Sequence, residues 1–170
     1  MRMKMSDTGT PFEMPTWDPC PFCERVAGRG ENRHVIHSTD KTLALLNPRQ
    51  FEIGQLLVVP RRHAPTILDL TDDEAGEIMK TVRIAAEALV KTFNPDGITV
   101  YQNNGVASLQ EVPHFHIHVV PRRKSSTWGS GPPHIAALQP KDGGLKQKVT
   151  VSWERAEEIA SIIRPNFKTI

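Results

Sequence analysis

The chain has 170 residues, a length typical of one globular domain, with an apolar share of 38% and 14 prolines. Its 21 basic and 19 acidic residues leave a formal net charge of +2, too balanced for bulk affinity for nucleic acid or an anionic membrane. The N-terminus has no sustained apolar run of the kind that a signal peptide needs, and no apolar stretch is long enough to span a bilayer. We therefore expect a cytoplasmic protein without a membrane partner.

In chain order, residues 1–17 mix small, polar and proline residues and predict a flexible arm, and a tight Cys20-Pro21-Phe22-Cys23 turn follows. Apolar or β-branched runs between turn residues predict short strands at 33–38, 42–46, 55–59, 98–102 and 114–120.

The strongest helix signal begins at Thr71, which forms a capping box with Glu74. Apolar residues then recur at steps of three and four as far as Phe93, which predicts one buried helical face. A second, shorter helix is expected over Trp153–Ile163, after a polar loop at 122–148. The order of elements predicts an α+β fold, an antiparallel sheet with a long helix packed on it. We expect the main domain to span 18–123 and a C-terminal loop and short helix to span 124–170.

The segment His114-Phe115-His116-Ile117-His118 alternates histidine with apolar residues. In a strand, this alternation places the three imidazoles on one face and the apolar side chains on the other. Three interpretations compete: exposed polar residues on a half-buried strand, a metal site built from all three histidines, or nucleophilic catalysis at phosphorus.

A loop just upstream favours catalysis. It contains Asn103-Asn104-Gly105 and ends at Gln110, so a glycine turn and amide side chains can donate hydrogen bonds to phosphate oxygens. Alone, this loop is also an ordinary turn; beside three histidines it strengthens the phosphate interpretation.

The histidine pattern, followed by Pro121-Arg122, resembles the signature of the histidine triad superfamily, and bacterial zinc-containing members in particular. The resemblance covers roughly residues 20–123. It implies an antiparallel sheet of about five strands with one long helix, a homodimer, and nucleotidyl transfer through a covalent nucleotidyl-histidine.

By the same resemblance, His116 is the nucleophile, His118 contacts phosphate, and the backbone of His114 fixes the nucleophile's tautomer. The other implied roles concern the substrate: Asn47 binds ribose, Asn103 and Gln110 bind phosphate, and Phe22 lines the base pocket or is simply a core residue.

Three positions depart from the family pattern. Gln55 stands where members often carry a fourth histidine, which puts a proton-relay role there in doubt. Glu111 replaces a serine or threonine, and its carboxylate would repel a phosphate unless it points away. Leu109 replaces a common glycine. These changes could lower the rate or alter the leaving group.

Cys20 and Cys23 have the spacing of two tetrahedral metal ligands, and a complete structural zinc site needs two more. His63 and His114 are the candidates that the resemblance supplies. The alternative is two reduced cysteines beside a surface His63. No organic cofactor is expected.

The activity that the resemblance implies is hydrolysis of a purine nucleotide, either a dinucleoside polyphosphate or a nucleoside phosphoramidate, with release of a nucleoside monophosphate. A nucleotide-binding protein with little turnover and a transferase to a sugar phosphate remain alternatives, as does a metallohydrolase that uses all three histidines. A nucleic-acid partner is not expected, because no basic cluster or DNA-binding module is evident.

Overall fold

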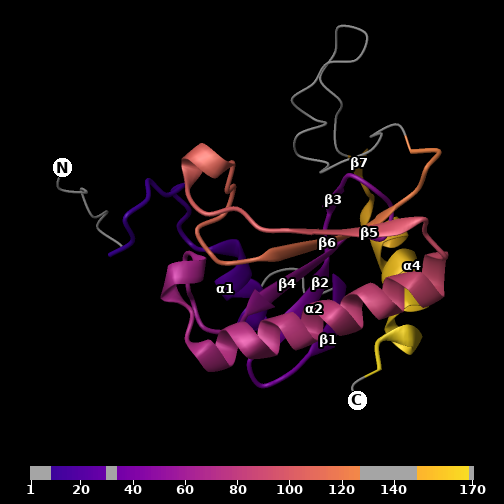
Figure 1. Ribbon diagram of the computed structural model, residues 1–170, viewed down its shortest axis with the longest axis horizontal. Helices are drawn as coiled ribbons and strands as arrows, with labels where there is room; N and C mark the ends of the chain where they lie inside the picture. The colour runs from indigo at the N-terminus through magenta and orange to yellow at the C-terminus, as the bar shows by residue number, and fades with distance from the viewer. Residues whose placement is uncertain (1–8, 30–33, 127–148, 169–170) are drawn as a thin grey trace, which may run out of the picture.

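The computed structural model describes residues 9–29, 34–126 and 149–168. Its centre is an antiparallel sheet with the strand order β1–β2–β4–β6–β5 (Figure 1). The strands are β1 (Val35–Ser38), β2 (Thr42–Leu46), β4 (Leu56–Pro60), β5 (Gly97–Tyr101) and β6 (Ile117–Arg122). Two further short strands, β3 (Arg49–Gln50) and β7 (Val149–Thr150), pair with each other and were not anticipated from the sequence. The expected α+β architecture is confirmed.

The long helix α2 (Asp72–Phe93) covers one face of the sheet (Figure 1). Thr71 and Glu74 form the predicted capping box, and Asn94 ends the helix in the left-handed conformation. The buried face of α2 packs against Phe115, Ile117 and Val119, the apolar members of the histidine segment. The apolar residues of that segment therefore face the core, as the alternation predicts.

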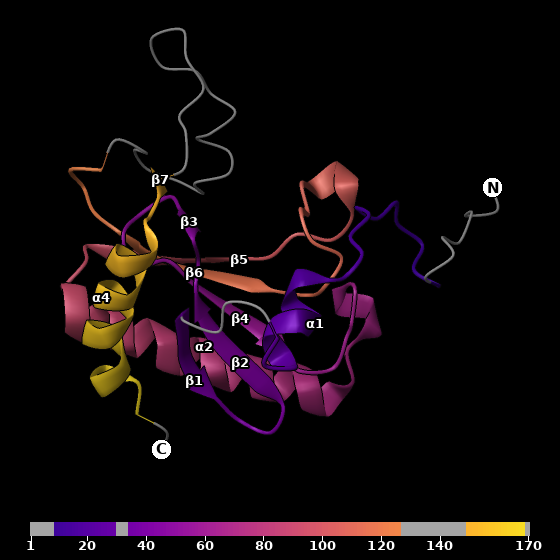
Figure 2. The same ribbon diagram turned by 180° about the vertical axis from the view of Figure 1, so that it is seen from behind.

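A short helix, α1 (Pro21–Val26), lies over the opposite face of the sheet, as the reverse view shows (Figure 2). Phe22 from this helix packs on residues of β2 and β4, namely Leu43, Leu45, Leu57 and Val59. Both strands are buried along their whole length, which explains why their sequences are continuously apolar rather than alternating.

The C-terminal helix α4 (Trp153–Ile163) is capped by Ser152, as expected. Its buried residues, Ala156, Ile159, Ala160 and Ile163, join the same hydrophobic core as α2. The boundary that we expect at residue 123 stays a prediction, and most of the expected 122–148 loop lies outside the described residues. The described residues also contain the 3-10 helices η2 (Ile67–Asp69), η3 (Val106–Ser108) and η4 (Arg164–Asn166). In the described parts of the chain, no helix combines the length and the apolar character that a membrane crossing requires.

One boundary differs from the prediction in a way that matters for the site. The strand expected at 114–120 begins only at Ile117. The N–H of His114 donates to the carbonyl of Val112 at 2.8 Å, and that of Phe115 donates to the carbonyl of Ala64 at 2.6 Å. Because these donors are used outside the strand ladder, His114 and His116 lie before the strand.

Candidate active site and metal cluster

His116 is held in one tautomer by the chain just before it. Its Nδ1 lies 2.7 Å from the carbonyl oxygen of His114. A carbonyl oxygen can only accept, so Nδ1 carries the proton and the lone pair of the neutral ring is on Nε2. Phe22 packs against the ring at a centroid distance of 5.2 Å, and the side chain is 6% exposed. This arrangement suits a nucleophilic imidazole.

His118 is fixed by a different partner, Gln55. The Oε1 of Gln55 accepts the backbone N–H of Phe51 at 2.8 Å, which turns the Nε2 amide toward Nδ1 of His118 at 3.0 Å. Because the amide donates, a neutral His118 carries its proton on Nε2, where it can donate in turn. Tyr101 stacks on the ring at 4.3 Å with an interplanar angle of 9°. Gln55, which cannot titrate, thus orients a hydrogen-bond donor.

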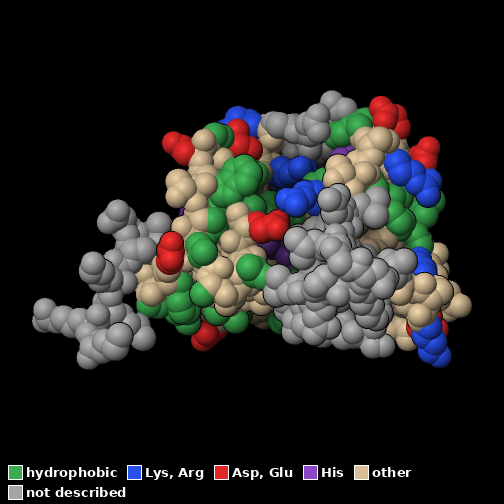
Figure 3. All heavy atoms as spheres, turned by 90° about the horizontal axis from the view of Figure 1, so that it is seen from above, with side chains coloured by type: hydrophobic (Ala, Val, Ile, Leu, Met, Phe, Trp, Pro, Cys, Tyr) green, Lys and Arg blue, Asp and Glu red, His purple; other side chains and the backbone are tan. Residues whose placement is uncertain are grey.

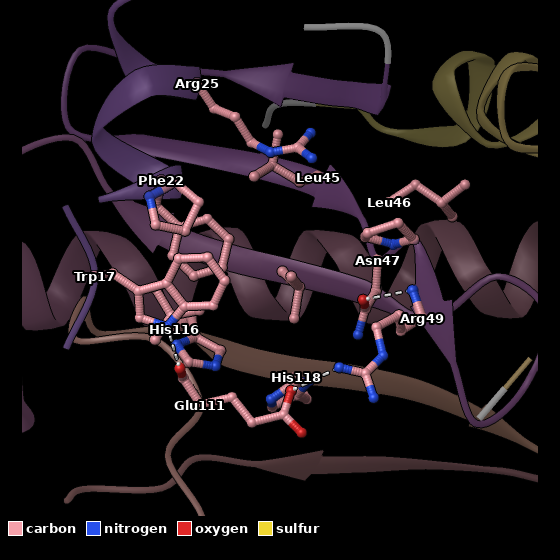
Figure 4. Close-up of a pocket in the computed structure, with 14 residues that line it drawn as sticks. Trp17, Phe22, Arg25, Leu45, Leu46, Asn47, Arg49, Glu111, His116 and His118 are labelled. Carbon is pink, nitrogen blue, oxygen red and sulfur yellow. Dashed lines mark hydrogen bonds and ion pairs between the residues drawn. The ribbon is translucent and has the colours of Figure 1, made fainter. Parts of the chain in front are cut away.

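Both histidines line a pocket of about 550 Å³, a volume within the range of small-molecule sites. Trp17 and Phe22 lie toward one end of the pocket, and Asn47 and Arg49 lie toward the other, as the close-up shows (Figure 4). Its lining residues are Trp17, Pro21, Phe22, Arg25, Leu45, Leu46, Asn47, Pro48, Arg49, Leu57, Glu111, Val112, His116 and His118. In the space-filling view, histidine side chains are partly visible near acidic and basic ones (Figure 3).

Of the residues expected to contact substrate, Asn47 and Phe22 line this pocket. Asn47 follows β2, and its Oδ1 accepts the backbone N–H of Arg49 at 3.0 Å. The pocket does not include Gln110, because the buried amide of this residue is engaged by its own loop. Its Oε1 accepts from Gly105 at 2.7 Å, and its Nε2 donates to the carbonyls of Pro65 and Val112 at 2.8 and 2.9 Å. Asn103 lies outside the lining set as well, with its Nδ2 3.5 Å from the carbonyl of Leu109.

His114, in contrast to its two neighbours, turns away from the pocket. Its Nε2 lies 2.9 Å from the carbonyl of Pro60 and donates to it, which leaves Nδ1 to face the Sγ atoms of Cys20 and Cys23, each at 3.6 Å. The Nδ1 of His63 lies 3.2 Å from the Sγ of Cys23. The three imidazoles of the histidine segment therefore do not converge, and the metallohydrolase interpretation is wrong.

The four atoms of this cluster fit a tetrahedral metal ion. All lie within 4.8 Å of one another. Bonds of about 2.0–2.3 Å to zinc place neighbouring ligands about 3.3–3.8 Å apart, close to the separations given above. In the absence of an ion, burial above all, then the neighbouring Cys20, raises the pKa of Cys23 to about 11. Burial likewise lowers the pKa of His114 to about 4, so its ring is neutral, as a metal ligand must be.

The pocket also contains residues that the sequence analysis did not single out. Trp17 donates from its indole Nε1 to the carbonyl of Glu111 at 2.7 Å. Arg49 lies 3.7 Å from the Glu111 carboxylate. No local pattern marks Trp17 or Arg49, because their partners are far away in the sequence.

The segment that carries Trp17 lies against the loop that precedes the histidines (Figure 1). The backbone N–H of Val106 donates to the carbonyl of Glu13 at 2.8 Å. Gly105 has φ +80°, and a Cβ there would approach Cβ of Phe12 to 2.9 Å, so glycine is required on both counts. Leu109, where the resemblance implies a glycine, adopts φ +64° with its side chain half exposed.

These features agree with what a comparison of sequences finds. A family model described as the HIT domain matches residues 29–125, more than half of the chain. The chain belongs to the HIT family. An uncharacterised HIT-like protein of Saccharolobus solfataricus is 32% identical over 122 residues, which cover 72% of this chain and 84% of that protein.

Other HIT proteins resemble the chain over most of its length. The bifunctional bis(5'-adenosyl)-triphosphatase/adenylylsulfatase FHIT of Arabidopsis thaliana is 32% identical over 125 residues, 74% of this chain and 69% of that protein. The crystal structure of a zinc-bound histidine triad family protein from Mycobacterium smegmatis superposes with a TM-score of 0.69 at 24% identity, covering 88% of this chain and 94% of that one. The last likeness shows the fold.

Proposed function

We propose that this HIT protein hydrolyses purine nucleotide substrates through a covalent intermediate on His116 and releases a nucleoside monophosphate. The observation that carries the proposal is the 2.7 Å contact between Nδ1 of His116 and the carbonyl of His114. It sets the Nε2 lone pair of a pocket-lining imidazole before any substrate arrives, so no energy is needed to select the tautomer during reaction. The named activity of the Arabidopsis relative supports the same class of reaction.

In the first step, the Nε2 lone pair of His116 forms a bond to the phosphorus of the bound nucleotide. The bond from phosphorus to the leaving group breaks, and its electron pair departs with that group, an anion or an amine that takes up a proton. Water then attacks phosphorus and releases one proton to the solvent, the P–N bond returns its electrons to Nε2, and the nucleoside monophosphate leaves. The proposed role of His118 is to donate from Nε2 to a phosphate oxygen in both steps, oriented by Gln55.

The nucleoside is proposed to lie toward Phe22, Leu45 and Leu57, where the pocket is apolar. Trp17 adds an aromatic ring at this end, suited to stacking on a purine. Asn47, a buried amide at the polar end, is the proposed partner of the ribose hydroxyls.

For the cluster of Cys20, Cys23, His63 and His114 we propose one structural zinc ion. The donor set and the separations of the ligand atoms support it. When bound, zinc would hold α1 to the segment before β6 and keep the backbone of His114 in place. With all four positions taken by protein ligands, no position remains for substrate.

We also propose a homodimer, as the resemblance implies. In the described residues, β5 has a neighbour only on its β6 side, and Val100 on this strand is half exposed. An open sheet edge with an apolar residue is a surface that a second copy can cover. Light scattering coupled to size exclusion tests it: the wild type should elute as a dimer and Val100→Arg as a monomer, whereas a wild-type monomer contradicts the proposal.

The test of the enzymatic function follows AMP release from adenosine 5'-phosphoramidate and from diadenosine triphosphate. The wild type should release AMP from at least one of them and, after rapid quenching, show an intact mass increased by one adenylyl group. His116→Ala should show neither, and His37→Ala, on β1, should behave as the wild type. Binding of nucleotide by the wild type without any release of AMP would instead favour the nucleotide-binding protein, an alternative that Glu111 and Gln55 keep open.

A further inference from the structure

Two of the residues that line the pocket form an ion pair, Arg49 on β3 and Glu111 on the loop before the histidines (Figure 4). Both residues line the pocket together with His116 and His118. Their charged atoms are 3.7 Å apart, too far for a hydrogen bond, and their side chains are 62% and 57% exposed. An exposed pair at this distance is weak and easily exchanged for another partner.

The backbones of both residues are held firmly even though their side chains are exposed. Arg49 donates its N–H to Asn47 and lies in register with Thr150 of β7. Glu111 accepts from Trp17 through its carbonyl and follows the buried, fully bonded Gln110. The two side chains can therefore turn while their backbones stay in place.

The Glu111 carboxylate also lies within electrostatic reach of the residues around the proposed phosphate site. Burial raises the pKa of the Tyr101 phenol above its usual range, and the charge of Glu111 raises it further. Tyr101 is the residue that stacks on His118. A negative charge here opposes an anionic leaving group, whereas the guanidinium of Arg49 favours one and can bind phosphate oxygens in pairs.

We propose that Arg49 and Glu111 form a charge-responsive clasp that selects the leaving group: a phosphate chain draws Arg49 away from Glu111 and is held by it, whereas an amine leaving group leaves the pair closed. The inference rests on the proposed hydrolysis and identifies its preferred substrate class as dinucleoside polyphosphates. Arg49 attracts the phosphate chain of such a substrate, and Glu111 repels it. The attack of His116 on phosphorus is unchanged. The clasp contacts only the leaving group, which takes the electron pair of the broken bond.

The test compares two substrates that deliver the same AMP, diadenosine triphosphate with ADP as leaving group and adenosine 5'-phosphoramidate with ammonia. The ratio of their kcat/KM values isolates the leaving group. Arg49→Gln should lower this ratio about tenfold, the effect of one charge-assisted contact, and Arg49→Lys should keep it within about threefold of the wild type. Glu111→Gln should raise it about threefold, the opposite sign.

Arg25→Gln is the matched control, because it removes an equal charge from the nucleoside end of the same pocket (Figure 4). Its ratio should equal that of the wild type. A ratio that is unchanged in Arg49→Gln, or that moves in the same direction in Arg49→Gln and Glu111→Gln, overturns the clasp while leaving the hydrolytic function intact.

A binding experiment tests the clasp separately from the hydrolytic function, even if the wild type turns over neither substrate. In the His116→Ala background, the Kd values of diadenosine triphosphate and AMP are compared by calorimetry. The clasp requires Arg49→Gln to weaken binding of diadenosine triphosphate about tenfold more than that of AMP. Equal weakening of both would refute it.

Discussion

Two sites share the histidine segment, and they are built in opposite ways. The cluster of Cys20, Cys23, His63 and His114 is closed, with its four ligand atoms within 4.8 Å of one another. The pocket of His116 and His118 is open, with about 550 Å³ of space before them. His114 belongs to both, because its side chain faces the cluster while its carbonyl oxygen sets the tautomer of His116. Neighbouring histidines thus acquire different roles, because each ring has a different hydrogen-bond partner at one of its two nitrogens.

The largest effect should separate the two sites outright. His116→Ala removes the proposed nucleophile, and we expect kcat to fall about 1,000-fold or more, as when other covalent nucleophiles are removed. The cluster uses other atoms, so zinc content and melting temperature should match the wild type. Stopped assays and metal analysis measure both. Loss of zinc from this variant would show that the sites are not distinct.

The converse variant, Cys23→Ser, should break the cluster first. Zinc content should fall from about one ion per chain toward none, and the melting temperature should fall by about 10 °C, because binding of a structural metal stabilises the folded state. Activity should be lost in parallel with unfolding. Chelation of zinc from the wild type should reproduce the result. A variant that keeps its melting temperature would argue against a structural ion.

A smaller effect tests how His118 is oriented. Gln55→Met keeps the approximate volume of the side chain but removes the donor to Nδ1 of His118, and we expect kcat/KM to fall about tenfold. Gln50→Met is the matched control, since Gln50 is equally buried and its Oε1 accepts the backbone N–H of Gly54 at 2.7 Å without contacting a histidine. Both variants should lose about 1–3 kcal/mol of stability by leaving a buried N–H without an acceptor. Equal losses of activity in Gln55→Met and Gln50→Met would show that Gln55 has only a structural role.

The smallest effect concerns the segment that carries His63. Arg62, its neighbour, donates to Glu74 at the start of α2 at 2.7 and 2.8 Å. This contact lowers the pKa of Glu74 from 4.5 to about 2. A lowered pKa in the folded state means that the contact stabilises the protein above about pH 4.5 and loses this effect as the pH falls toward 2.

Glu74→Gln should therefore be less stable than the wild type by about 1 kcal/mol at pH 7. The difference between the two melting temperatures should shrink between about pH 5 and pH 2, and differential scanning calorimetry at each pH measures it. Glu87→Gln, which alters a solvent-accessible pair with Arg83 on α2, should show little difference at any pH. A gap for Glu74→Gln that stays constant with pH would contradict the assignment.

What the sequence could predict depended on how local each interaction is. The N-terminal ends of α2 and α4 can be predicted from Thr71, Glu74 and Ser152, because the hydrogen bonds of these side chains stay within the first helical turn. The cysteine pair likewise follows from its spacing, while His63, 40 residues from Cys23, came from the resemblance. Trp17 and Glu111 are 94 residues apart, so nothing near either of them indicates their contact.

The same reasoning explains the two amides whose placement was not as expected. Gln110 bonds to Pro65, 45 residues away, and so supports the loop rather than lining the pocket. Asn103 lies in the same loop and also turns toward its backbone, at Leu109. An amide donor beside a glycine turn indicates phosphate contact only when the fold does not already use its hydrogen bonds.

The position of Trp17 and α1 has a practical consequence for anyone who expresses this domain. The region that the family model matches starts at residue 29. A shortened gene that follows this boundary would omit Trp17, Phe22 and both cysteines, and with them part of the pocket lining and half of the proposed zinc ligands. Such a fragment could retain the full histidine signature and still lack what keeps His114 in place, so its inactivity would say nothing about the intact protein.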